Sequence, residues 1–147
     1  MRIVRNCLLG LHIFVGLGGM AGGLAAILDP SAPLGAPSSM LKGSPFDSFL
    51  IPGIILFSVI GVGNLASAFC FVFRKRWQGY VSGVSAGALV IWIVVQCVML
   101  RTVVFLHVLF FLIGAAMGCL ALALLASERL WPGTWVLRLV TRVSGGK

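Results

Sequence analysis

A handful of side chains could support binding chemistry in an otherwise strongly apolar sequence: Asp47, Gln96, Arg101 and His107. Gln96 and His107 are equally far from Arg101-Thr102, so a helical hairpin turning there would put both at one depth in a membrane. Arg101 would lie at the turn, and Asp47 would begin another helix from the same side. Ionisable groups at membrane depth are costly and often mark a functional site. The pattern predicts a polar cluster at the outer end of the molecule that binds a lipid or small amphiphile.

An alternative explanation gives each of these residues an ordinary structural role. Gln96 and His107 would hydrogen-bond each other across two helices, an interaction worth about 0.6–2 kcal/mol in a membrane. Arg101 would extend to the lipid headgroups. Asp47 would cap the N-terminus of the second helix. Both explanations place the four residues at the same end of the molecule.

The sequence offers little for catalysis or for metal binding. His12 and His107 lie toward opposite faces of the membrane, and no acid or thiol cluster joins either, so we predict no metal and no cofactor. His12 is instead predicted to pair with Asn64. The cysteines lie on separate apolar segments without a C-x-x-C pair, and we interpret all of them as small buried residues: Cys7, Cys70, Cys97 and Cys119. The shortage of acid–base pairs makes an embedded enzyme the least favoured function.

Composition places the chain in a membrane. Of its 147 residues 60% are hydrophobic and only 10% are charged, and the mean hydropathy is +1.12. That is too little charge to cover a soluble domain. A helix needs about 20 apolar residues to cross the bilayer, and the candidate spans are residues 7–28, 50–73, 80–99 and 103–126. We expect an all-α single domain with four transmembrane helices in a compact bundle.

The basic residues are distributed unevenly over the two sides of the predicted spans. Lys42 and Arg101 fall on one side, and the others fall on the opposite side: Arg2, Arg5, Arg74, Lys75, Arg76, Arg129, Arg138, Arg142 and Lys147. This asymmetry predicts an inner (cytoplasmic) membrane protein with both termini in the cytoplasm. Anionic lipid headgroups, rather than nucleic acid, are the expected partners of these charges. A cleaved signal peptide over residues 1–25 is the competing interpretation, but the apolar run continues to Leu28.

The segments between the spans differ in character. The outer loop, residues 29–49, is rich in Pro, Gly and Ser and cannot form one continuous helix. The turn at Arg101-Thr102 has no Gly, Pro or Asn, and it is predicted only because residues 81–126 as one helix would be about 70 Å long. Beyond residue 126, the cytoplasmic tail 127–147 contains Pro132-Gly133 and then an amphipathic pattern. One face of that helix would carry Trp135, Leu139, Val140 and Val143 and would lie in the membrane interface.

Small residues recur at four-residue spacing in every span. The pairs and strips are Gly18/Gly22, Gly19/Gly23, Gly63/Ser67, Gly79/Gly83/Gly87 and Gly114/Gly118. Such faces let helix backbones approach closely in lipid. We expect them to pack within the chain, and dimerisation is the alternative.

The stretch "LKGSPFDSFLIPGIILFSVIGVGN" resembles a group of small bacterial hypothetical membrane proteins with four spans, in which an "SPF" loop runs into "LIPG" and a Gly-rich helix. The resemblance covers Leu41 to Ser67 and implies the four-span fold but no activity. The small-residue faces of the helices instead motivate the leading functional interpretation, an accessory or structural subunit that acts through helix packing, as a homo-oligomer or within a larger membrane complex. The lipid or amphiphile binder is the alternative.

Overall fold

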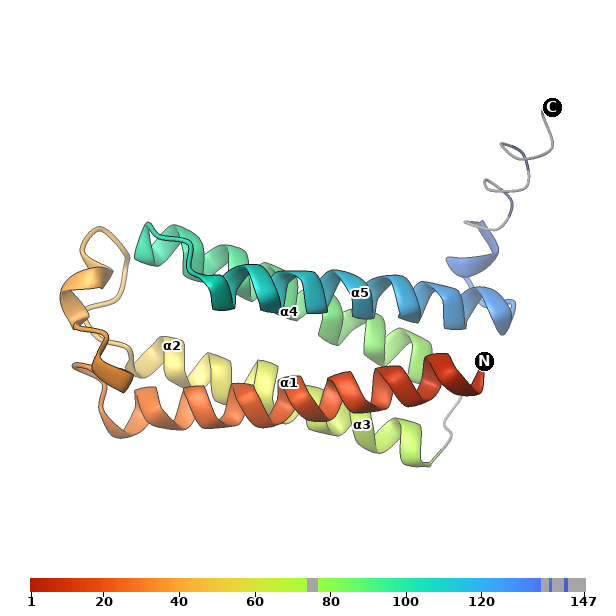
Figure 1. Cartoon of the computed structure of the whole chain (residues 1–147), viewed down its shortest axis with the longest axis horizontal. Coiled ribbons are helices and arrows are strands. Elements are labelled where there is room, and N and C mark those ends of the chain that lie inside the picture. The colour runs from red at the N-terminus through yellow and green to blue at the C-terminus, as the bar shows by residue number, and fades with distance from the viewer. Residues whose placement is uncertain (74–76, 136–137, 139–141, 143–147) are drawn as a thin grey trace.

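The computed structural model describes residues 1–73, 77–135, 138 and 142, and its regular elements are all helical (Figure 1). In chain order they are α1 (Arg2–Leu28), the 3-10 turns η1 (Pro33–Gly35) and η2 (Ser38–Leu41), α2 (Leu50–Ile55), the π-helical η3 (Leu56–Val62), α3 (Gly63–Val72), α4 (Gln78–Leu100) and α5 (Phe105–Ser127). No strand occurs in these described ranges.

Four helices are long and apolar enough to cross a membrane, which confirms the predicted all-α class and the number of spans. They are α1, the second span formed by α2, η3 and α3 (Leu50–Val72), α4 and α5. The predicted bounds hold to within a few residues at most ends. The largest difference is in α1, which begins at Arg2 rather than at residue 7.

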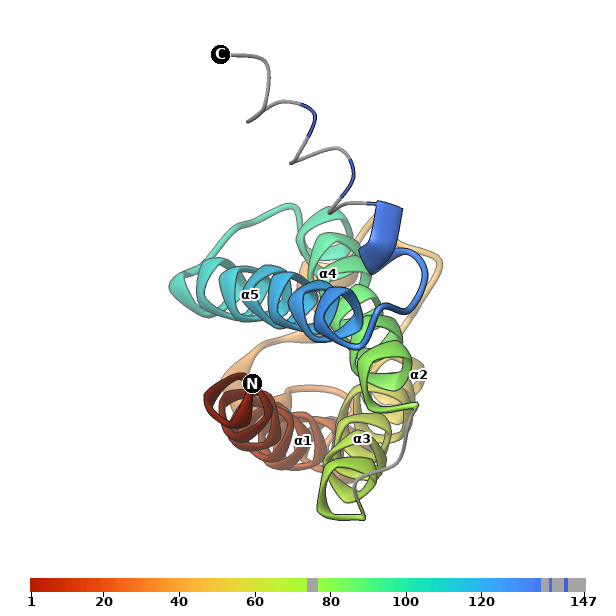
Figure 2. The ribbon, with the colours of Figure 1, turned by 90° about the vertical axis from the view of Figure 1, so that its right-hand side faces the viewer.

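The four spans are arranged around a common axis (Figure 2). α1 neighbours the second span and α5, and α4 neighbours the same two elements, so α1 and α4 are diagonally opposed. Of these neighbouring pairs, α1 and α5 make the loosest contact. The outer loop and the α4–α5 turn lie at one end, and the N-terminus and the end of α5 lie at the other (Figure 1).

The closest helix contact is between α1 and η3, and glycines make it possible. A Cβ on Gly19 would lie 2.8 Å from the backbone nitrogen of Gly61, and one on Gly23 would lie 2.5 Å from that of Phe57. Neither position leaves room for a side chain. This part of the predicted small-residue packing is therefore within the chain, in line with the role of small residues in lipid.

The other glycines divide into distinct groups. Gly79 and Gly114 pack between α4 and α5, where an added Cβ would meet Leu125 and Val90. Gly83 and Gly87 have nothing from the described residues within 4 Å of an added Cβ. The predicted strip on α4 is thus used for packing at Gly79 and is open beyond it.

The turn between α4 and α5 occurs where the length argument predicted it. Arg101 ends α4 in the left-handed conformation, with φ 50° and ψ 30°. An added Cβ on Gly43, itself at φ 90°, would lie 2.8 Å from an Arg101 guanidinium nitrogen. The guanidinium therefore lies directly on the outer loop. A tertiary contact accompanies this turn, in place of the Gly or Asn that usually favours such a conformation.

The outer loop is closed at its base, where the Phe49 N–H donates to the Pro30 carbonyl at 2.9 Å. Beyond α5, the chain folds back so that the Leu130 N–H bonds the Leu125 carbonyl at 2.8 Å. Helical structure resumes at Gly133–Trp135. The apolar face predicted for the tail at Leu139, Val140 and Val143 lies outside the described residues.

Candidate ligand-binding site

A cavity of about 380 Å³ lies in the outer half of the molecule, and every span contributes to its wall. Most of the wall is apolar. The residues of the outer loop and of the second span that line it are Pro33, Leu34, Ala36, Phe49, Pro52, Gly53, Leu56 and Ile60. Those of α1, α4 and α5 are Gly18, Gly19, Gly22, Ala26, Leu89, Trp92, Ile93, Gln96, Leu100, Val104, Leu106, His107 and Phe110. Its size is at the lower end of the range for small-molecule sites.

Glycines of α1 leave the space that the cavity occupies. An added Cβ on Gly22 would meet only the Leu56 side chain, at 3.4 Å, and one on Gly18 only Phe110, at 3.6 Å. The cavity continues to the turn where the second span begins, at Pro52 and Gly53. The same glycine-rich helix therefore packs tightly through one face and borders the cavity with another.

Trp92 and Gln96 supply polar groups from α4, where their spacing of four residues puts them on one face. Trp92 is only 7% exposed. Its indole nitrogen is buried and has no hydrogen-bond partner among the described residues. An unpaired buried N–H costs about 1–3 kcal/mol, so a residue that lines the apolar cavity carries a donor that lacks an acceptor.

His107 contributes a second donor from the first turn of α5. Its Nδ1 accepts a hydrogen bond from the Val104 N–H at 3.3 Å. A backbone N–H can only donate, so the neutral ring carries its proton on Nε2. His107 also lines a groove of about 380 Å³ on the outside of α4 and α5, with Cys97 and Val98. It is therefore shared by the cavity and the lipid-facing surface.

The structure brings together two of the four residues predicted for this end. Gln96 and His107 line one cavity, but no hydrogen bond joins them, so their predicted direct pairing is wrong. Arg101 is outside the cavity lining and contacts Gly43 instead. Asp47 is also outside the lining, and it forms no ion pair with another described residue. Trp92 joins the cluster without having been predicted, since an indole in an apolar run looks like ordinary core.

The proposed capping role of Asp47 is wrong as well. Asp47 is exposed, and the N-cap of α2 is Phe49, with no side-chain hydrogen bond. At the start of α2, the Leu50 N–H donates instead to Ser48 Oγ, at 3.5 Å. The helix begins two residues later than a cap at Asp47 requires.

A separate polar cluster lies in the inner half and joins three spans. His12 Nδ1 is 2.8 Å from Asn64 Oδ1, and His12 Nε2 is 2.8 Å from Ser82 Oγ. The Asn64 amide nitrogen donates to the Ile60 carbonyl at 2.8 Å, which leaves its oxygen to accept from His12. The predicted His12–Asn64 pair is confirmed, and Ser82 is an addition. Because every one of these polar groups is satisfied, the cluster is a structural element rather than a ligand site.

Other chemistry has little support in the described part of the chain. It contains no group of three or more His, Cys, Asp or Glu that could hold a metal ion. The cysteines are free, and Cys7 and Cys119 are exposed on the helix surfaces. The interpretation of every cysteine as buried is therefore wrong for these two, and Cys70 and Cys97 are only half-buried.

No protein-family model matches the sequence, and neither a curated protein nor a solved structure matches the chain. The chemistry of the outer cavity is therefore the basis on which its ligand must be inferred.

Proposed function

We propose that this protein binds a lipid or small amphiphile in the outer cavity. One observation carries the proposal: an apolar cavity is lined by Trp92, whose buried indole N–H has no hydrogen-bond partner among the described residues. His107 and Gln96 line the same cavity, and the bond from Val104 to Nδ1 leaves the His107 proton on Nε2. An apolar body that carries a hydrogen-bond acceptor, such as a carbonyl, ester or carboxyl oxygen, fits these groups.

The cavity volume limits the part of the ligand that is enclosed. About 380 Å³ suits a small amphiphile or one end of a lipid. The loose contact between α1 and α5 gives a route from the bilayer. Gly18 and Phe110 border the cavity along that contact, and Phe14 stacks on Phe110 with ring centroids 5.9 Å apart.

The test uses Trp92 as the reporter. The other tryptophans are 68%, 71% and 58% exposed, so replacing Trp77, Trp131 and Trp135 by Phe leaves only the fluorescence of the cavity indole. The full chain in mild detergent is titrated with a dibrominated stearic acid and with the dibrominated alkane of the same length. The acid should quench Trp92 at lower concentration, because only the acid carries an acceptor.

Three variants test whether the quenching reports binding in the cavity. Gly22→Leu should fill the cavity and reduce quenching, whereas Gly10→Leu on the same helix should not, because Gly10 has nothing within 4 Å of an added Cβ. Gln96→Leu should reduce the preference for the acid about two- to tenfold, the value of one hydrogen bond. Equal quenching in Gly22→Leu and Gly10→Leu would contradict binding in the cavity.

A second candidate function is that of an accessory subunit or homo-oligomer, which is the leading interpretation from the sequence. The open positions Gly83 and Gly87 on α4 favour it, together with the exposed Val84 and Ile91 on the same helix. Two helices could approach closely along such a face. Replacing Gly83 and Gly87 by Leu should abolish any oligomer seen by native mass spectrometry, and Gly10→Leu should preserve it. An unchanged oligomer would exclude this face.

The same proposal includes the placement in the cell. We infer a compact bundle in the bacterial inner membrane, with both termini and the Trp135 end of the tail on the cytoplasmic side. The excess of Lys and Arg in the sequence at the start of α1 and after α5 supports this orientation, since the N-terminus and the end of α5 lie at one end of the molecule (Figure 1). The tail is proposed to lie as an amphipathic helix in the membrane interface.

A further inference from the structure

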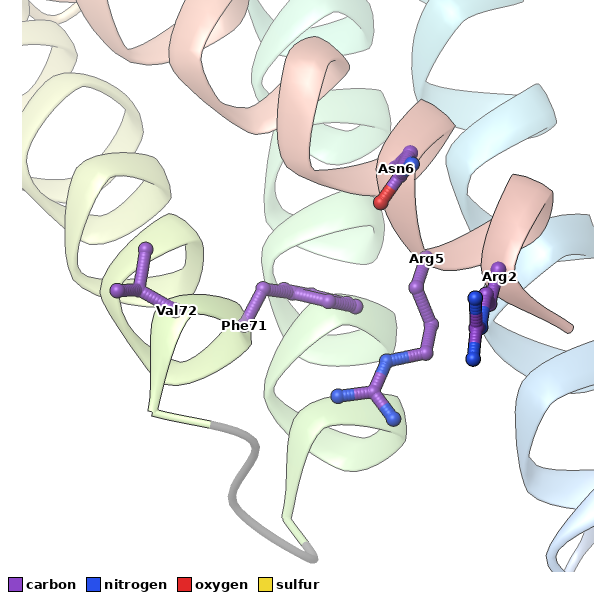
Figure 3. A pocket seen from close by; sticks show the side chains of 5 residues that line it. All are labelled: Arg2, Arg5, Asn6, Phe71 and Val72. Carbon is purple, nitrogen blue, oxygen red and sulfur yellow. The ribbon is translucent and has the colours of Figure 1, made fainter.

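A second cavity, of about 540 Å³, lies at the opposite end of the molecule from the outer cavity, and its lining is basic. Five described residues line it: Arg2, Arg5, Asn6, Phe71 and Val72. We refer to it as the inner basic pocket. Figure 3 shows Arg2 and Arg5 descending from the first turns of α1, with the Phe71 ring pointing from α3 toward Arg5.

The two arginines are held on one side of α1. They are three residues apart, so their side chains emerge about one turn from each other on the same face. Asn6 adds a carboxamide beside them. Two guanidinium groups and one amide nitrogen are thereby offered to one space, and a guanidinium fork matches two oxygens of a phosphate group.

The charge of the pocket is not neutralised within the described part of the chain. Neither Arg2 nor Arg5 has an ion pair or a hydrogen-bonding side-chain partner there. The sequence has only three acidic residues. Asp29 follows α1 and Asp47 precedes α2, both at the outer end, whereas Glu128 follows α5 at the inner end but does not line the pocket. α1 also has no acidic residue in its first turn, so the partial positive charge of its N-terminus adds to that of the arginines.

The pocket also has an apolar side. Phe71 is buried and packs against the His12 ring, with centroids 5.8 Å apart, and Val72 is exposed at the end of α3. A ligand there meets a hydrocarbon surface next to two cations. That combination suits a phosphate group attached to an alkyl or glycerol unit.

We propose that the inner basic pocket is a binding site for a phosphate anion, held by Arg2, Arg5 and Asn6. It is distinct from the outer cavity and goes beyond the function proposed for that cavity. It is also more specific than the general attraction of basic residues to anionic membranes. The anion has two sources, the headgroup of an anionic phospholipid or free phosphate, and the test distinguishes them.

The test measures lipid binding by the full chain in mild detergent, using native mass spectrometry. Phosphatidylglycerol, phosphatidylcholine and inorganic phosphate are compared. Wild type should bind phosphatidylglycerol more tightly than phosphatidylcholine, and Arg5→Gln or Arg2→Gln should weaken that binding about tenfold, the value of one charge-assisted hydrogen bond. Arg5→Lys keeps the charge and loses the fork, so its affinity should be intermediate.

The matched control is Lys42→Gln, which removes one positive charge at the outer end. It should leave phosphatidylglycerol binding unchanged, and melting without lipid should show that all variants are folded. If inorganic phosphate displaces the lipid completely, the site recognises free phosphate; if it does not, the site recognises the headgroup. Equal losses in Lys42→Gln and Arg5→Gln, or equal affinity for the two lipids, would overturn the proposal. Gly22→Leu should not alter this binding, so the two sites can fail independently.

Discussion

His12 uses both of its ring nitrogens inside the membrane-spanning part of the molecule. It bonds Asn64 of the second span and Ser82 of α4, which is the helix diagonally opposite its own. A neighbouring bond between Ser67 Oγ and Ser85 Oγ, at 2.7 Å, joins the second span to α4 at the same end. Single polar side chains thereby fix which helix faces meet in the inner half.

The first prediction concerns this histidine. His12→Leu leaves Asn64 Oδ1 and Ser82 Oγ without their partner and should lower the free energy of unfolding by about 1–3 kcal/mol. The double variant with Asn64→Leu should show a coupling of about 0.6–1.7 kcal/mol, the range found for hydrogen bonds between membrane helices. Unfolding in mixed detergent micelles measures both values. A coupling of zero would mean that the bond contributes nothing to stability.

A second prediction at this scale concerns Asp29, just after α1. Its Oδ1 accepts hydrogen bonds from Ser31 Oγ at 2.7 Å and from the Ala32 N–H at 3.1 Å. These bonds, the Ser31 side chain first, lower the pKa of Asp29 below its ordinary value of 3.8. The turn should therefore be intact above pH 3.8 and be lost as the pH falls through the lowered pKa.

The measurement is the pH dependence of the Ser31 and Ala32 amide proton shifts by NMR. Asp29→Asn is the matched control, because its amide oxygen still accepts these bonds but does not titrate. A titration midpoint of these amide shifts at or above pH 3.8 in wild type, or an equal pH dependence in Asp29→Asn, would contradict the assignment.

The sequence was sufficient to predict those residue pairs that depend only on how deep each residue lies in the membrane. His12 with Asn64, and Gln96 near His107, follow from counting 1.5 Å per residue along antiparallel helices. Ser82 and Trp92 could not be found in this way, because their roles depend on how each helix is rotated about its axis. The predicted capping role of Asp47 is wrong for a local reason. The helix begins at Leu50, so Asp47 lies too far before its first turn to cap it.

At the scale of elements, the second span is the least regular part of the fold. It changes from α-helix to π-helix over Leu56–Val62 and back to α-helix at Gly63. The π-helical segment η3 contains Gly61, which packs on Gly19. Its residues Leu56 and Ile60 line the outer cavity. π-helical turns are rare and frequent at functional sites. Hydropathy patterns do not distinguish them from α-helix, so the sequence predicted only a continuous span.

The third prediction tests the α1–η3 contact. Gly19→Ala should destabilise the protein by about 1–3 kcal/mol, because the new Cβ meets backbone that cannot move aside easily. Gly10→Ala in the same helix should be neutral or stabilising by up to about 1 kcal/mol, since the methyl group there is unobstructed and alanine favours helix. The free energy of unfolding in mixed micelles gives the comparison. Equal effects of the two changes would show that α1 does not pack closely on η3.

At the scale of the whole molecule, the sequence predicted the number of spans and the end at which each connection lies. It could not predict the order of helices around the axis, because all four spans are apolar on most faces. The diagonal placement of α1 and α4 depends instead on glycine contacts and on His12. The resemblance of residues 41–67 to four-span bacterial proteins stays a prediction.

The fourth prediction concerns orientation. In a chain whose four native cysteines are replaced by Ala, a cysteine at position 35 should react with an impermeant thiol reagent from outside the cell. A cysteine at position 77 should react only after permeabilisation, because the basic end is predicted to face the cytoplasm. The opposite pattern of labelling would reverse the orientation.

The layers of the molecule also differ in how densely they are packed. A cavity of about 380 Å³ lies at the level of Trp92, whereas the side chains around His12, between that cavity and the inner basic pocket, are almost completely buried. Enclosed void volume is what hydrostatic pressure acts to eliminate. Compression should therefore perturb the resonances of Trp92 and Phe110 at lower pressure than those of His12 and Asn64. The layer around Trp92, where α1 and α5 are least tightly joined, should thus be more compressible than the layer around His12.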